Sequence, residues 1–371
     1  MVETFRLHKT ITGEPLSIPV KAPGRWKQSM TAVGAGRHTI SLAGTKFTRA
    51  DWQDATKPWV RSLSCWQDGV VKYGGMIVDY DWDHDGKLLT LDTVTPDAIL
   101  RDRYPFGVGT YLTDPDFVVT SASLRSAAER AIRRVTGGFG GAEWEMPFRF
   151  QNLTEAGTFS KTWTKDEWAK ASDIVDLIRK MVGGPDIATV PYSDAGYLKY
   201  DVLTGTPRVA GETIDLPLSV RNSRASGLHT IGSGQSMASG VFARAAGAGE
   251  DRKVGLAGYF SGVPTDAPEM LVRDVATNGV ATKEQSVANS HAQAYLDLNT
   301  WMTKQRQFDL NVERRNKQPA FPIADLKLGT RFNARFSGDE YEDAFSQLLY
   351  TVALSYDSSK PNTFSPEVQK L

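Results

Sequence analysis

The chain has 371 residues and no net charge at neutral pH, because 43 Lys and Arg side chains balance 43 Asp and Glu side chains. This length allows two or three domains, and the charge balance gives no global attraction to nucleic acid or to an anionic membrane. Cys65 is the only cysteine, which excludes an intrachain disulfide framework and any zinc or iron–sulfur site built from several cysteines. We therefore expect folding in a reducing compartment and partners that are recognised by shape.

The N-terminal region does not resemble a targeting segment. Residues 1–30 alternate polar and apolar positions and contain three prolines, without the continuous apolar stretch of a signal peptide. No apolar run reaches the length of about 18 residues that predicts a membrane-spanning helix. We expect synthesis in the cytoplasm and no membrane-spanning segment.

The first third of the sequence predicts β-structure. Its β-branched and aromatic side chains are concentrated in short segments separated by turn residues, which is typical of half-buried strands. Residues 83–86, with the sequence Asp-His-Asp-Gly, suit a hairpin connection. We interpret residues 1–105 as one β-domain, either a barrel or a sandwich. The expected strands cover residues 37–47, 59–66, 70–79 and 88–94.

Two helices are expected between residues 106 and 186, which we interpret as an α/β module. The first has apolar side chains at three- and four-residue spacing and ends at Gly137-Gly138. The second begins at Thr164, where Glu167 completes a capping-box pattern, and extends to Val182. The apolar positions of the first helix are Leu124, Ala128, Ala131, Ile132 and Val135.

The rest of the chain, residues 187–371, predicts a second β-domain. A helix is expected over residues 283–301, where alanines and leucines lie on or near one face. The last dozen residues contain Pro361 and Pro366, and we expect an exposed tail there. The expected strands cover residues 197–203, 212–220, 237–246, 308–312, 331–336 and 347–356.

The sharpest local motif is a run of alternating aspartates. Asp81, Asp83 and Asp85, then Gly86 and finally Asp92, match the spacing of the calcium loop in EF-hand proteins. The Asp at the twelfth position is shorter than the usual bidentate Glu, and both flanks predict strands instead of helices. The alternative is a polar hairpin tip in which Asp and Gly serve the turn. We favour the hairpin and assign no residue as a metal ligand.

The sequence contains no recognisable catalytic constellation. Gly234-Gln-Ser236 resembles a nucleophile elbow but lacks the second glycine. Gly247-Ala-Gly249 begins like a dinucleotide-binding fingerprint, but Arg252 occupies the place of the third glycine. We therefore predict that the protein is not an enzyme, with no catalytic residue and no cofactor. The histidines are too widely spaced for a zinc-peptidase pair: His8, His38, His84, His229 and His291.

Tryptophans and arginines allow other interpretations. Nine tryptophans and many carboxylates would suit a protein that binds or hydrolyses cell-wall polysaccharide, which is the alternative function. Core packing is the default for most of these rings, including Trp59, Trp66 and Trp168. The candidates for subunit contacts are Trp59, Trp66, Trp82, Trp144 and Trp163. Five arginines with acidic neighbours predict a solvated face that could still touch passing DNA: Arg130, Arg133, Arg134, Arg221 and Arg224.

Two segments of the chain resemble minor tail proteins of siphophages that infect actinobacteria. They are residues 197–207 (YLKYDVLTGTP) and residues 233–249 (SGQSMASGVFARAAGAG). Other segments agree in their order along the chain: residues 78–103, Asp173-Ile-Val-Asp176, Pro185-Asp-Ile187, 281–301, 308–313 and 328–336. The likeness extends over nearly the whole chain and is to the tail hub, which is also the N-terminal region of tail-associated lysins.

The resemblance implies an α+β, mainly β fold with two tail-tube-like β-barrels, an α/β module between them and a helical insertion in the second. It implies a homotrimer whose six barrels form a pseudo-sixfold ring at the tail tip of the virion. Its partners would be the distal tail protein, the tape measure protein and other minor tail or receptor-binding proteins, with transient contact to genomic DNA in the lumen. Because the sequence ends at Leu371, soon after the last β-block, no lytic activity is expected.

Overall fold

The structure is a computed structural model, and it describes residues 2–30, 32–106, 116–137, 145–206, 208–219, 223–233, 237–245, 252–258, 274–280, 285–299, 303–312, 321, 323–340 and 343–370. The chain divides into two compact units. One consists of Met1–Leu228 with Gln307–Leu371, and the other of His229–Arg306. The predicted boundaries near residues 105 and 186 are not tested by this division and stay a prediction.

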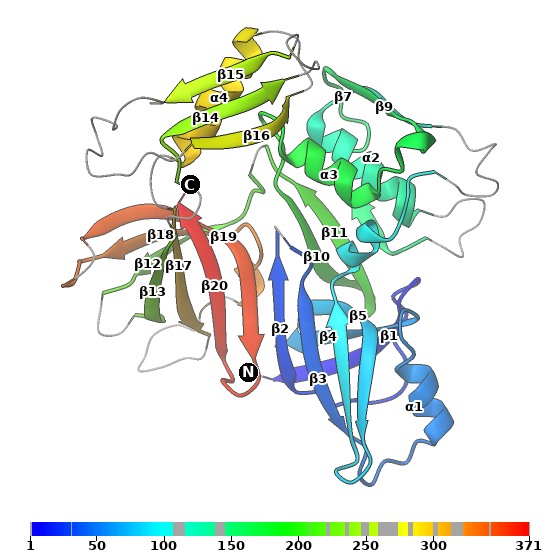
Figure 1. Ribbon diagram of the computed structural model, residues 1–371. Coiled ribbons are helices and arrows are strands. Elements are labelled where there is room, and N and C mark those ends of the chain that lie inside the picture. The colour runs from blue at the N-terminus through cyan, green and yellow to red at the C-terminus, as the bar shows by residue number, and fades with distance from the viewer. Residues whose placement is uncertain are drawn as a thin grey trace. The chain divides into compact units, whose positions relative to one another are not determined.

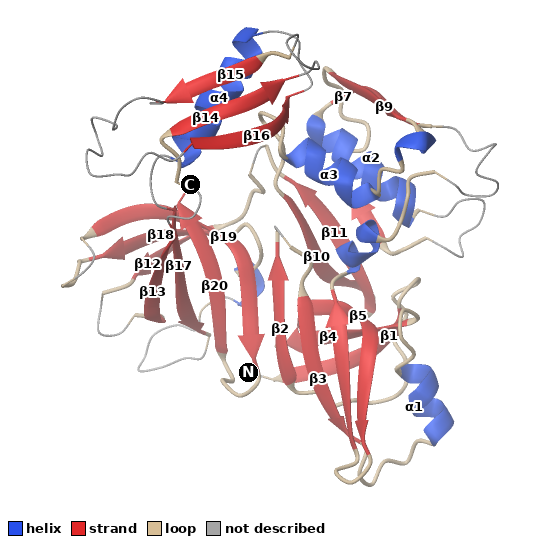
Figure 2. Ribbon diagram, in the orientation of Figure 1, coloured by secondary structure: helices blue, strands red, loops and turns tan. Residues whose placement is uncertain are grey.

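The fold is mainly β (Figure 2), as the sequence predicts. A 12-stranded sheet has the order β1-β4-β5-β6-β3-β2-β19-β20-β17-β13, and β18 pairs with both β12 and β19 (Figure 1). Its N-terminal strands are β1 (Glu3–Lys9), β2 (Gly24–Ser29), β3 (Ala35–Ser41), β4 (Arg61–Gln67), β5 (Val70–Asp83) and β6 (Leu88–Val94). Its other strands are β12 (Thr213–Pro217), β13 (Ala225–Ser233), β17 (Thr303–Asn311), β18 (Arg331–Phe336), β19 (Phe345–Asp357) and β20 (Thr363–Lys370).

Smaller sheets and helices complete the fold. The helices are α1 (Arg49–Ala55), α2 (Leu124–Thr136), α3 (Ala171–Arg179) and α4 (Gln285–Asn299), with 3₁₀ turns at Pro96–Arg101, Lys165–Glu167 and Ile323–Asp325. The further strands are β7 (Phe117–Ala122), β8 (Phe148–Phe150), β9 (Phe159–Trp163), β10 (Ile187–Asp194), β11 (Tyr197–Thr204), β14 (Gly240–Ala245), β15 (Val254–Gly258) and β16 (Asp274–Val280). None of the described helices is long and apolar enough to span a membrane.

The long strand β19 joins the N-terminal strands to the C-terminal strands. Its first half pairs with β18, from Phe345 to Tyr350, and its second half pairs antiparallel with β2, from Ala353 to Asp357. Six N-terminal strands and six C-terminal strands therefore belong to one hydrogen-bonded sheet. The pairing of the described residues contains no closed barrel. The two separate barrels implied by the resemblance thus stay a prediction.

An aromatic cluster fills the core beneath this junction. Trp26 of β2 is 3% exposed and stacks on Tyr73 of β5, with ring centroids 5.4 Å apart. Tyr356 of β19 and Phe364 of β20 also contact the indole, at centroid distances of 6.0 and 6.1 Å. The rings come from both halves of the chain, so their burial stabilises the junction as well as each half.

The helix α2 confirms the prediction from apolar spacing. Ser123 caps its N-terminus by accepting a hydrogen bond from the backbone N–H of Ser126, and Gly137 ends it. The predicted second helix is wrong at its start, because the backbone at Trp168 is left-handed, with φ of 50°. The helix α3 begins at Ala171, where the Asp173 carboxylate accepts the backbone N–H of Lys170, and it ends at Arg179 instead of Val182.

The predicted C-terminal tail is also wrong, because residues 363–370 form the strand β20. Phe364 and Val368 are fully buried, and the strand pairs antiparallel with β19. Pro366 is accommodated opposite Leu354, close to a register shift in β19 between Thr351 and Ala353. An irregular place in the ladder tolerates a residue without an N–H group.

The unit of residues 229–306 has its own small core. Here β14 pairs with β15 antiparallel and with β16 parallel. The helix α4 packs on β14 and β15, which confirms the predicted helix with slightly shorter bounds. Its buried side chains Ala288, Ala292 and Leu296 are small or aliphatic, which lets the helix lie close to the sheet.

Candidate functional site

The polar face of the 12-stranded sheet carries a row of charges at the β2–β19 junction. The register places Asp357 opposite Arg25, Arg25 opposite Arg37, and Arg37 opposite Asp92. Asp92 in turn lies opposite Asp79 of β5. Five charged positions therefore cross β19, β2, β3, β6 and β5 in one line. Side chains directly opposite each other on one face interact, so each charge in this line attracts or repels its neighbours.

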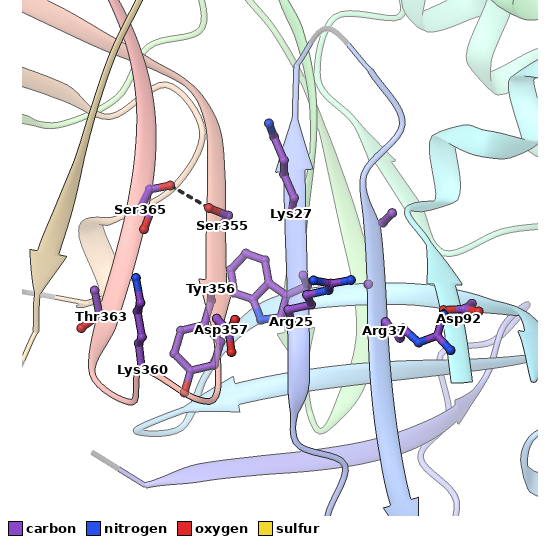
Figure 3. Close-up of a pocket in the computed structure, with 13 residues that line it drawn as sticks. Arg25, Lys27, Arg37, Asp92, Ser355, Tyr356, Asp357, Lys360, Thr363 and Ser365 are labelled. Atoms are coloured by element: carbon purple, nitrogen blue, oxygen red, sulfur yellow. Dashed lines mark hydrogen bonds and ion pairs between the residues drawn. The ribbon is translucent and has the colours of Figure 1, made fainter. Parts of the chain in front are cut away.

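A surface hollow of about 510 Å³ is lined by Asp357, Arg25, Arg37 and Asp92 of this row, and Figure 3 shows its lining. Besides these four residues, its lining includes Lys27, Lys360, Ser355 and Ser365. Lys27 forms an ion pair with Glu367 of β20, and the Ser355 hydroxyl donates to the Ser365 carbonyl at 3.1 Å. Trp26 and Tyr356 of the aromatic cluster also line it. The hollow is shallow and open, so it suits a contact with another surface better than the enclosure of a small molecule.

The acidic ends of the row balance its central arginines. Asp357 accepts the backbone N–H of Ser359 at 2.8 Å, and this bond, the Ser359 hydroxyl and the cations Arg25 and Lys360 hold the pKa of the carboxyl below its usual range. At the other end Arg37 reaches Asp92 at 3.7 Å. Arg25 and Arg37 repel each other across the strands, and the flanking carboxylates offset that repulsion.

The side chains that line this hollow are mainly charged groups and hydroxyls. The lining of the hollow includes neither a histidine nor a cysteine. Among the residues that the structure describes, no group of three or more His, Cys, Asp or Glu side chains is placed to hold a metal ion. The single thiol, Cys65, is fully buried, and burial raises its pKa well above the usual value.

The aspartate motif forms a hairpin tip. β5 and β6 pair as far as Asp83 opposite Leu88, and the Asp83 carboxylate accepts the backbone N–H groups of Asp85 and Gly86 at 3.0 and 3.1 Å. Asp92, the twelfth position, lies far along β6 beside Arg37 instead of at the tip. The side chains of the motif thus serve a turn and a strand face, as the favoured hairpin interpretation predicts.

Two of the five histidines are buried and neutral. His8 lies in a chain of hydrogen bonds in which its Nδ1 contacts the Gly13 carbonyl at 2.9 Å and its Nε2 contacts the Ser64 hydroxyl at 2.8 Å. His38 is fully buried between the rings of Phe5 and Tyr73, and its Nε2 has no partner. Burial lowers the pKa of both imidazoles to about 4.

We expect the free energy of unfolding to fall as the pH drops from 6.5 to about 4. In this window the unfolded chain protonates His8 and His38 while the folded chain keeps them neutral, so acid favours unfolding. Each histidine contributes about 3 kcal/mol to the loss. Urea denaturation at several pH values measures how the free energy of unfolding depends on pH. His38→Gln should flatten the dependence, whereas His229→Gln, at an exposed position, should not; equal slopes would contradict this account.

The tryptophan candidates divide between core and surface. Trp66 and Trp163 are buried, and Trp66 donates its indole N–H to the Ser64 hydroxyl at 2.7 Å. Trp59 and Trp168 are 51% and 57% exposed, which corrects the expectation that they pack in the core. Both have left-handed backbones, which interrupt the regular strand or helix pattern at these positions. Trp82 is partly buried, and Trp144 lies outside the described residues.

The arginine group holds local structure together. Arg130 donates to the Leu153 carbonyl and Arg134 to the Pro105 carbonyl, both at 2.8 Å. Arg133 pairs with Glu145 at 2.5 Å. Arg221 lies outside the described residues, as do residues 234–236 and 246–251 of the two glycine-containing motifs. Contact of these arginines with DNA stays a prediction.

No protein-family model and no curated protein sequence matches the chain. Solved structures match it from end to end. The 43 kDa tail protein of prophage MuSo2 from Shewanella oneidensis is 12% identical, with a TM-score of 0.57, and the match covers 100% of this chain and 98% of that protein. The chain has the fold of phage tail proteins.

Two further solved structures support the same fold. A tail protein from Neisseria meningitidis MC58 is 10% identical, with a TM-score of 0.58 and coverage of 100% of this chain and 97% of the other. A type VI secretion component of E. coli, described as structurally similar to the T4 tail proteins gp27 and gp5, is 9% identical, with a TM-score of 0.50 and coverage of 96% and 75%. At these identities the likeness shows the fold alone.

Proposed function

We propose that this chain is a structural protein of a bacteriophage tail tip. It acts as a hub that joins the tail tube and the distal tail protein to the tape measure protein and to other minor tail or receptor-binding proteins. The observation that carries the proposal is the end-to-end match with tail proteins, which leaves no large part of this chain for a separate catalytic domain. Its place is the virion tail tip.

The sheet supports a trimeric ring. One subunit supplies six N-terminal and six C-terminal strands that are joined at β2 and β19. Three subunits therefore supply six such groups, which suits a threefold assembly that must match a sixfold tube. In a closed ring, every copy of a head-to-tail interface is occupied by a neighbouring subunit. Strand edges that are open in the single chain can be covered in the same contacts. The genome and the tape measure protein pass through the lumen.

Cryo-electron microscopy of the assembled tail tests this role. The hub predicts three copies around the tail axis, between the tube and the tip components. Copies attached at the periphery would contradict it and would favour a receptor-binding protein. Release of sugars or peptides from purified host cell wall by the isolated chain would contradict it in favour of a wall hydrolase.

A further inference from the structure

The outer part of β5 has a free strand edge. β4 pairs with β5 only as far as Ser62 opposite Met76, whereas β6 continues along β5 to Asp83. The last contact on the β4 side is the backbone N–H of Trp59, which donates to the Ile77 carbonyl at 2.7 Å. Within the described part of the chain, no strand pairs with this side of β5 beyond that point. Residues 78–83 therefore offer an open row of backbone donors and acceptors.

One face of this free edge carries unbalanced negative charge. Asp79, Asp81 and Asp83 alternate along the strand and are exposed. Asp79 lies directly opposite Asp92, an arrangement of like charges that costs stability. The side-chain carboxylates of Asp79 and Asp81 have no ion-pair or hydrogen-bond partner among the described residues, although the backbone of β5 pairs with β6 here. The free chain thus keeps a local repulsion that a cationic partner would relieve.

The other face of the same edge opens into an aromatic hollow. Tyr80 and Trp82 alternate with the aspartates, and together with Phe47 and Trp52 they line a hollow of about 960 Å³ next to α1. Tyr80 is 60% exposed although its cross-strand neighbour Leu91 is fully buried. Aromatic rings with open faces in a hollow are ready to receive apolar side chains.

We propose that residues 78–83 receive an extended segment of a partner protein in which basic side chains alternate with apolar ones. The segment adds a strand to β5, so that its backbone pairs with the open edge. Because side chains of a strand point alternately to its two faces, basic groups meet Asp79 and Asp81 while apolar groups enter the hollow. A sugar ligand would use the rings but would leave the strand edge and the carboxylates unused. This docking site goes beyond the hub role and does not require ring closure.

A labelled peptide of seven residues, Lys-Val-Lys-Leu-Lys-Val-Lys, tests the site by fluorescence anisotropy against the full chain. We expect saturable binding at low salt that weakens about tenfold in the Asp79→Asn/Asp81→Asn variant, because two exposed charge pairs are lost. The same peptide with alternate backbone nitrogens methylated keeps its charges and cannot pair with the edge, so it should not bind.

A matched control is Asp85→Asn, which removes one exposed carboxylate from the hairpin tip instead of the edge. It is compared with the single variant Asp81→Asn. Asp85→Asn should leave the peptide affinity within about twofold of the wild-type value. Equal binding of the methylated peptide would overturn the proposal, because charge alone would then explain the affinity. So would unchanged affinity of the double variant, or binding of the neutral sugar chitohexaose without binding of the peptide.

Discussion

A chain that ends at Asn362 should not reach the folded state. The missing strand β20 lies between β19 and β17, so its loss leaves both neighbours with an unpaired edge. It also removes Phe364 and Val368 from the core. The lost burial of two such side chains alone is comparable with the whole stability of an ordinary domain, which is about 5–15 kcal/mol. Far-UV circular dichroism and thermal unfolding measure the outcome.

A point variant keeps this prediction testable if the truncated chain cannot be purified. Phe364→Ala should lower the free energy of unfolding by about 3–5 kcal/mol. Thr363→Ala, at the partly exposed neighbouring position, should change it by less than about 0.5 kcal/mol. A truncated chain with a native melting temperature, or equal effects of the two point variants, would contradict this role of β20.

Trp26→Ala should strongly destabilise the β2–β19 junction. The indole contacts Tyr73 from the N-terminal strands and Tyr356 and Phe364 from the C-terminal strands, so the cavity lies where the two groups meet. We expect a loss of about 3–5 kcal/mol in the free energy of unfolding. Urea denaturation followed by fluorescence and by circular dichroism measures it.

Trp26→Phe is the matched control. It keeps a ring in the cluster and removes an indole N–H that has no hydrogen-bond partner, so it should cost clearly less than the alanine variant. The two probes should also report one shared transition in the wild type, because the joined sheet couples both groups of strands. Separate transitions for the two groups would contradict that coupling.

Local patterns predict much of the secondary structure. The strand β18 has the predicted bounds, and β6 does too, because alternation and turn residues mark them on their own. The helix α3 starts late because a left-handed Trp168 interrupts a capping pattern that is complete in the sequence. β20 could have been found from the alternation of Phe364 and Val368 with polar neighbours, but Pro361 and Pro366 outweighed that signal.

The charged row could not be predicted from the sequence. Asp357 and Arg25 are separated by most of the chain, and only the register between β19 and β2 makes them neighbours. A shift of one residue would turn either side chain to the opposite face, and no local pattern fixes a pairing between such distant strands. The free edge of β5 is equally hidden, since it depends on where β4 stops pairing.

We propose that the joined strand groups let three copies close a ring. Mass photometry of the purified chain over a range of concentrations tests it most directly. The account predicts a species of three times the 40.7 kDa subunit mass. A species of 40.7 kDa at every concentration, or one of six subunits, would contradict it.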